Sequence, residues 1–188
     1  MTKRLILDRA LELFTDKGYE GCSMDDIAKA VGIRKASLYA HFEGKERVFA
    51  TIFEEILDEY VRYIGELTAP EPGDCAVARL KHIFLSFISY CHGNLRMYFW
   101  DRYFYYPPEF LKEYIGLKTR ETNDIFLERI GLWTQKGVES GQIRAENARN
   151  VALAYYYLMI GLSMSVKLFD AEELRREAEA AWKGLNLD

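Results

Sequence analysis

The sequence has few of the residues on which metal sites and catalytic sites are usually built. It holds three histidines and three cysteines in 188 residues, and none lies in a CxxC, HExxH, nucleophile-elbow or glycine-rich phosphate-loop pattern. His82, Cys91 and His92 would spread over nearly three turns of one helix, too far apart to share a metal ion. We therefore expect no enzymatic activity, no metal and no cofactor. Cys22, Cys75 and Cys91 are expected to be small apolar side chains, and a redox pair of Cys75 and Cys91 is the alternative.

Long apolar runs are also missing. No stretch approaches the roughly 18–20 apolar residues of a membrane helix, and charged residues occur within the first eight positions. We therefore expect no membrane association, no secretory signal and a cytoplasmic location. The chain is nevertheless 49% hydrophobic and 14% aromatic, which predicts a well-packed core and excludes a disordered chain.

Helix breakers are sparse as well. The chain has four prolines, two of them in residues 68–73, the clearest interruption. Elsewhere apolar residues recur at helical spacing, as Leu7, Ala10, Leu11 and Phe14 do, and no alternating strand pattern occurs. We predict an all-α fold of nine helices, three small ones in front and six behind. The first ends at Lys17, and the others cover about 24–30, 34–41, 45–67, 77–91, 95–106, 108–140, 147–169 and 172–185.

The segment 23–42 predicts a helix-turn-helix. Ser23 is a good N-cap, and Asp25 and Asp26 occupy the first helical turn, where the helix dipole favours acids. Gly32 supplies the turn between two short helices. Helices joined in this way can place the second one in the major groove of DNA.

The net charge of −4 at first argues against a nucleic-acid partner. Its distribution weakens that objection, because residues 1–48 hold nine basic and eight acidic residues, whereas the remainder holds sixteen and twenty-one. Arg34, Lys35, Lys45 and Arg47 form a local basic edge that can bind phosphates.

A recognition helix is buried on one side and exposed on the other. Leu38 and Phe42 lie one turn apart and can pack on Ile27, Ala28 and the stripe of the first helix. Polar residues are then left to divide between base edges and phosphates. These candidates are Arg34, Lys35, Ser37, Tyr39 and His41, together with Lys45 at the start of the following helix. The alternative is a helical hairpin with solvated charges.

Three stretches carry a resemblance to a known family. Residues 18–19, 23–33 and 37–46, in their order and spacing, closely resemble the amino-terminal domain of TetR/AcrR-family transcriptional repressors. The matching segment covers about residues 5–57. The resemblance implies a helix-turn-helix DNA-binding domain in residues 1–46 (motif about 23–42) and a ligand-binding and dimerisation domain in residues 47–188.

The resemblance also assigns roles within the motif. It implies that Leu38 and Phe42 are core positions, that Tyr39 and the capping Ser23 contact phosphates, and that Lys45 contacts the DNA backbone. Arg34 departs from the family pattern, which commonly has Ser or Thr at this helix start. Because arginine cannot accept the capping hydrogen bond, the cap of this helix is expected to differ.

The resemblance implies that the last two helices pair two subunits. Small or apolar residues at helical spacing fit a four-helix bundle built from two copies. The predicted interface residues are Ala154, Leu158, Gly161, Leu162, Ser165, Leu174, Ala178, Ala181 and Trp182. The alternative is that these faces are buried only against their own domain.

The aromatic run 95–106 is the candidate ligand pocket. Met97, Trp100 and Phe104 share one face of the predicted helix, and the alternative is that they form ordinary core. The predicted pocket residues are Phe84, Phe87, Met97, Trp100, Asp101, Tyr103, Phe104, Tyr114, Phe126 and Tyr155. An inward Asp101 would suit a lipophilic cation and an inward Arg102 an acid, and the sequence leaves both open.

Together these patterns predict a homodimeric, sequence-specific transcriptional regulator. Its expected partners are double-stranded DNA, a second copy of the chain and a small-molecule effector. We expect a repressor that leaves a palindromic operator when a small lipophilic molecule binds. A helical protein-interaction module without DNA binding is the alternative, and the sequence also allows activation in place of repression.

Overall fold

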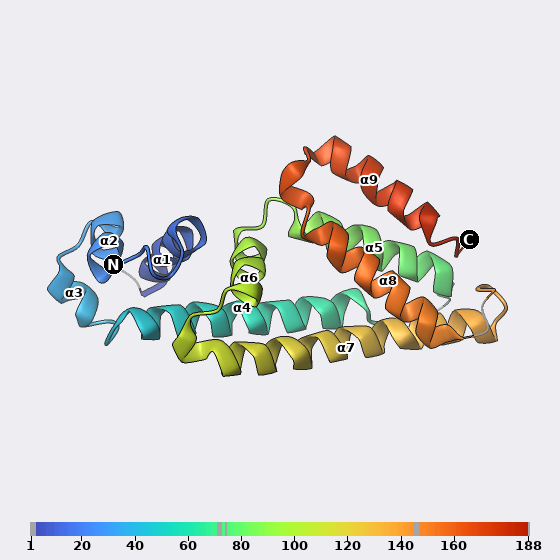
Figure 1. The fold of residues 1–188 in the computed structure, drawn as a ribbon, viewed down its shortest axis with the longest axis horizontal. Helices are drawn as coiled ribbons and strands as arrows, with labels where there is room; N and C mark the ends of the chain where they lie inside the picture. Colours follow the sequence, from blue (N-terminus) through green and yellow to red (C-terminus); the bar gives the residue numbers. More distant parts are fainter. Residues whose placement is uncertain (1–2, 71–72, 74, 145–146, 188) are drawn as a thin grey trace. The chain divides into compact units, whose positions relative to one another are not determined.

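The fold was analysed in a computed structural model that describes residues 3–70, 73, 75–144 and 147–187. Nine α-helices and no strand occur in these ranges, as the periodicity predicts. The helices are α1 (Lys3–Lys17), α2 (Met24–Val31), α3 (Lys35–Tyr39), α4 (Lys45–Leu67), α5 (Ala76–Cys91), α6 (Leu95–Tyr105), α7 (Lys112–Glu139), α8 (Ala148–Ser163) and α9 (Ala171–Gly184) (Figure 1). Short 3₁₀ turns cover Glu109–Leu111 and Val166–Leu168. Positions 71 and 72 of the predicted breaker lie outside the described residues.

Two compact units make up the chain. The first combines Met1–Val61 with Leu95–Lys118, and the second combines Arg62–Asn94 with Thr119–Asp188. The first unit therefore extends past residue 46, where the sequence predicts the end of the DNA-binding domain, and it takes in α6. Helices α4 and α7 each contribute residues to both units.

An aromatic cluster forms the core of the first unit. Phe49 of α4 lies at its centre, with ring centroids 5.4 Å from Phe14 of α1, 5.1 Å from Phe99 and 4.6 Å from Tyr103 of α6. All four side chains are buried. Because α1 and α6 pack against the same ring, α6 supports the amino-terminal helices directly.

Helices α5, α8 and α9 form the core of the second unit and lie side by side (Figure 1). The rings of Phe84, Tyr155 and Trp182, one from each helix, meet with centroids 5.6–6.3 Å apart. The buried Tyr155 hydroxyl donates to the carbonyl of Leu80 at 2.7 Å, which satisfies this polar atom of the core.

The predicted helix 147–169 is too long. Helix α8 ends at Ser163, and a separate 3₁₀ turn covers Val166–Leu168. The Ser163 hydroxyl donates to the carbonyl of Ile160 at 2.8 Å. Serine hydroxyls that bond to carbonyls of the preceding turn compete with the helical ladder, which fits an end at this point.

Candidate nucleic-acid interface

Helix α2 begins with the N-cap that the sequence predicts. The Ser23 hydroxyl accepts from the backbone N–H of Asp26 at 3.2 Å, and the Asp26 carboxylate accepts from the Ser23 backbone N–H at 2.9 Å. This capping box satisfies two N–H groups that a helix start leaves without partners. The hydrogen bond from the Ser23 hydroxyl to the Asp26 carboxylate lowers the pKa of that carboxyl, so Asp26 stays ionised in the capped state.

The turn after α2 also matches the prediction. Gly32 has φ = +77°, a left-handed conformation that favours glycine. Its backbone N–H donates to the carbonyls of Ala28 and Lys29. Helix α3 follows three residues later. Arg34 is its N-cap and makes no side-chain capping bond, as expected for arginine.

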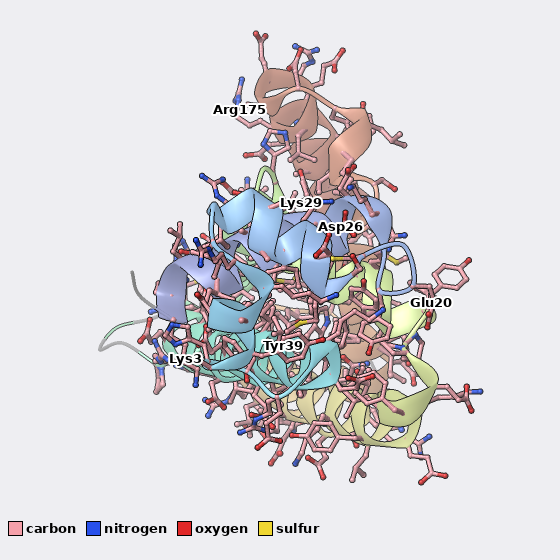
Figure 2. The ribbon with its side chains drawn as sticks, turned by 90° about the vertical axis from the view of Figure 1, so that its left-hand side faces the viewer. Lys3, Glu20, Asp26, Lys29, Tyr39 and Arg175 are labelled. Atoms are coloured by element: carbon pink, nitrogen blue, oxygen red, sulfur yellow. The ribbon has the colours of Figure 1, made fainter. Side chains whose placement is uncertain are left out.

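Helix α3 is buried on one side. Leu38 is 0% exposed and Phe42, just after the helix, is 3% exposed, which confirms both as core positions. The opposite side exposes Arg34, Lys35, Ser37 and His41 to solvent. Tyr39 is 47% exposed, and Figure 2 shows it on the face of the unit turned toward the viewer, with Lys3 and Glu20 on either side.

The charges on this face are partly compensated. Asp25 of α2 lies 3.0 Å from the Lys29 ammonium, which raises the pKa of Lys29, and 3.9 Å from that of Lys35. Within the described residues no carboxylate lies within 4.0 Å of the Arg34 guanidinium. Arg34 and Lys35 are consecutive residues. Among the described residues Arg34 has no ion pair, and the ion pair of Lys35 with Asp25 is long and exposed.

Lys45, whose predicted contact with the DNA backbone remains a prediction, makes a contact within the protein. Its ammonium donates to the backbone carbonyl of Tyr19 at 2.9 Å and lies 4.0 Å from the centroid of the Tyr19 ring. In this arrangement Lys45 ties the first turn of α4 to the loop after α1. The neighbouring Arg47 is exposed, so it is the more available cation at this end of α4.

Helix α6 caps the carboxyl end of α1. The Arg102 guanidinium donates to the carbonyl of Thr15 at 3.1 Å, and the Tyr103 hydroxyl donates to that of Phe14 at 2.9 Å. The last carbonyls of a helix lack intrahelical partners and carry the negative end of the helix dipole, which a guanidinium complements. Gly18 follows with φ = +79°, and a Cβ there would lie 2.7 Å from Arg102 Nη2. Arg102 thus points to α1, and no sequence pattern predicts this contact between residues 87 positions apart.

We expect Tyr103→Phe to lower the free energy of unfolding by about 1 kcal/mol, because it removes a buried hydrogen bond and leaves the ring in place. Urea denaturation of the full chain at one fixed protein concentration measures the change. Tyr106→Phe, at a residue that is 79% exposed, is the matched control and should change stability by less than about 0.5 kcal/mol. Equal stability of the two variants would contradict the capping role of Tyr103.

The predicted pocket residues divide between the two units. Met97, Trp100, Asp101, Tyr103, Phe104 and Tyr114 belong to the first unit, and Phe84, Phe87, Phe126 and Tyr155 belong to the second. Most of these rings have ring partners within their own unit. Trp100 stacks on Phe53 at 5.6 Å, and Phe87 lies 5.2 Å from Phe126. A shared pocket remains a prediction.

Phe104 differs from the predicted stripe. Met97 and Trp100 are 2% and 7% exposed, but Phe104 is 40% exposed and its ring contacts Tyr105. Phe104 therefore does not share the burial of Met97 and Trp100, and its place in a ligand pocket remains a prediction. Phe104 lies one turn after Trp100 in the sequence, but in the last turn of α6 it is Tyr103, packed on Phe49, that is buried.

The predicted interface residues fall into two groups. Ala154, Leu158 and Gly161 of α8 are exposed, whereas Leu162, Ser165 and Ala181 are half-buried. Leu174, Ala178 and Trp182 are at most 4% exposed, and Trp182 packs on Phe84 and Tyr155 of the same chain. This corrects the assignment of those three to a face between subunits, since helical spacing alone does not tell which partner covers a stripe.

Two features absent from the described ranges bear on other functions. No group of three histidine, cysteine, aspartate or glutamate side chains in these ranges is placed to hold a metal ion. No helix of this part of the chain combines the length and the apolar character needed to cross a membrane.

The amino-terminal helices are similar to those of a known family of proteins. Residues 6–52 match the model described as bacterial regulatory proteins, tetR family. Over 62 residues the chain is 40% identical to the biofilm operon icaADBC HTH-type negative transcriptional regulator IcaR of Staphylococcus epidermidis. That match covers 33% of this chain and 34% of IcaR, so the chain spans about a third of that relative's length.

Solved structures match over nearly the whole chain. The TetR-family regulator PfmR from Thermus thermophilus aligns with a TM-score of 0.70 and 23% identity, covering 98% of this chain and 95% of PfmR. AibR, in complex with isovaleryl coenzyme A and operator DNA, aligns with a TM-score of 0.70 and 20% identity, covering 95% of each chain. At these identities the likeness establishes the fold.

Proposed function

We propose that this chain is a TetR-family, ligand-responsive, sequence-specific DNA-binding transcriptional regulator. The observation that carries the proposal is the exposed, uncapped start of α3. Arg34, Lys35 and Ser37 are all exposed there, while Leu38 fixes the helix from behind. A short rigid helix with basic and hydroxyl side chains on its free side suits the major groove.

The proposed assembly is a homodimer on a palindromic operator. Support comes from α8 and the turn after it, where Tyr157, Leu158, Met164 and Leu168 are 65%, 37%, 43% and 79% exposed. Large apolar side chains gathered within twelve residues are typical of a surface that another protein covers. A two-fold dimer presents one recognition helix to each half-site.

We further propose that a small lipophilic effector releases the regulator from DNA. AibR, which shares the fold, binds isovaleryl coenzyme A and operator DNA. In this chain, α6 holds α1 through Arg102 and Tyr103, so a shift of α6 would move the helix that supports α2 and α3. The start of α4 at Lys45, bound to the loop after α1, is the second place where such a shift would act. A coupling free energy of about 1–3 kcal/mol would weaken DNA binding five- to a hundredfold.

Tyr39→Phe tests the DNA-binding face with a change of one atom. The variant should bind every duplex about tenfold more weakly, because each subunit loses a hydrogen bond to a phosphate. The slope of log affinity against log salt should stay the same, since no charge is removed. Fluorescence anisotropy with a duplex of arbitrary sequence at several salt concentrations measures both. Tyr106→Phe is the control, and a Tyr39→Phe variant that binds like the unmodified protein would contradict the assignment.

A further inference from the structure

A cleft separates α5 and α9 within the second unit. The two helices run antiparallel (Figure 1): the Lys81 ammonium lies 3.1 Å from the Glu179 carboxylate near one end, and His92 Nε2 lies 3.2 Å from the carbonyl of Phe169 near the other. The cleft between these two contacts has a volume of about 640 Å³. This volume lies in the range that small-molecule binding sites have.

Small side chains keep the cleft open. Ala171 and Ala178 line it from α9, and Ser86 and Ser89 line it from α5. Ile88, Leu174 and Ala178 are 1%, 4% and 3% exposed and form the closely packed base of the cleft. Leu85, Tyr90 and Ala171 leave apolar surface exposed along its walls, beside the hydroxyl groups of α5.

Among the described residues, Arg175 is the charged residue of the lining that has no counter-ion. The other lining charge, Glu179, is paired with Lys81, and the neighbouring Arg176 lies 2.8 Å from Glu172. In the described part of the chain no carboxylate comes within 4.0 Å of the guanidinium of Arg175, which is exposed on the second turn of α9 (Figure 2). A guanidinium beside apolar walls suits a carboxylate with an apolar body, since its planar fork matches two carboxylate oxygens.

We propose that the α5–α9 cleft binds an amphipathic monocarboxylate. The carboxylate pairs with Arg175. The hydrocarbon body lies along the cleft against Leu85, Tyr90 and Ala171, the apolar lining residues that keep exposed surface. Arg175 is the one unpaired cation that the described residues place in the lining, and it balances a single negative charge. The acidic residues Asp170, Glu172 and Glu173 at the start of α9 disfavour a dianion such as a phosphate monoester. The proposal concerns a site of its own and does not depend on DNA binding.

Isothermal titration of the full-length protein with decanoate, kept below its micelle concentration, tests the proposal. We expect saturable binding with one site per chain. Arg175→Gln should weaken it about tenfold or more, because it removes a charge-assisted hydrogen bond. Arg176→Gln, one residue away and outside the cleft lining, is the matched control and should bind within about twofold of the unmodified protein. Decyltrimethylammonium, with the same chain and the opposite charge, should not compete.

A second pair of variants tests the cleft independently of charge. Ala178→Leu fills the cleft from its base and should abolish decanoate binding, whereas Ala180→Leu on the exposed side of α9 should leave it intact. If Ala178→Leu does not fold, as its melting curve would reveal, Ser89→Leu closes the cleft from the exposed edge of α5. The proposal is overturned if decanoate does not bind, if Arg175→Gln and Arg176→Gln bind it equally, or if the cation competes with it.

Discussion

Lys35→Ala is expected to lower affinity for the operator at least about thirtyfold while changing affinity for arbitrary DNA much less. A side chain that contacts a base edge contributes about 1–3 kcal/mol of discrimination, and a dimer loses two such contacts. On arbitrary DNA the same variant loses one charge per subunit, a smaller, salt-dependent effect. The measurement is the ratio of the two dissociation constants at one salt concentration.

Lys29→Ala is the matched control for this prediction. Lys29 and Lys35 both lie beside Asp25, and both are exposed, but Lys29 belongs to α2. The control removes the same charge from the same ion-pair group and leaves the recognition helix intact. If the two variants lose operator affinity and specificity to the same extent, Lys35 acts only through its charge and reads no base.

Leu38→Ala is expected to lower the free energy of unfolding of the amino-terminal helices by about 2–5 kcal/mol. Leu38 is fully buried, and α3 has only five residues, too few to be stable without packing. We expect the variant to lose operator binding because α3 no longer holds its position. Urea denaturation and DNA binding of the full chain measure the two effects.

Ser37→Ala is the control for Leu38→Ala, because it changes the preceding residue on the exposed side of the same helix. Its free energy of unfolding should stay within about 0.5 kcal/mol of the unmodified protein. A Leu38→Ala variant that remains as stable as Ser37→Ala would show that α3 is not held by this side chain.

Local signals account for the parts of the site that could be predicted from the sequence. The cap at Ser23 and the turn at Gly32 depend on residues within a few positions of each other, and both are present as predicted. The burial of Leu38 and Phe42 follows from helical spacing. Caps, turns and buried positions of such short segments can be predicted from the sequence because the interacting residues are close together in it.

Contacts between distant residues explain what could not be predicted. The binding of Lys45 to Tyr19 joins residues 26 positions apart, and that of Arg102 to Thr15 joins residues 87 positions apart. No spacing rule indicates either partner. Trp182 shows the same limit, since its apolar stripe is clear in the sequence but its neighbours Phe84 and Tyr155 appear only in the fold.

Selection of bound duplexes from a random DNA pool, by the purified full-length protein at about 0.15 M salt, tests the central claim most directly. The account predicts enrichment of a palindrome whose half-sites lie about 34–36 Å apart, or a multiple of that spacing, as two recognition helices related by a two-fold axis require. Folded protein that enriches no sequence at this or at lower salt would contradict it and would favour a helical interaction module that does not bind DNA.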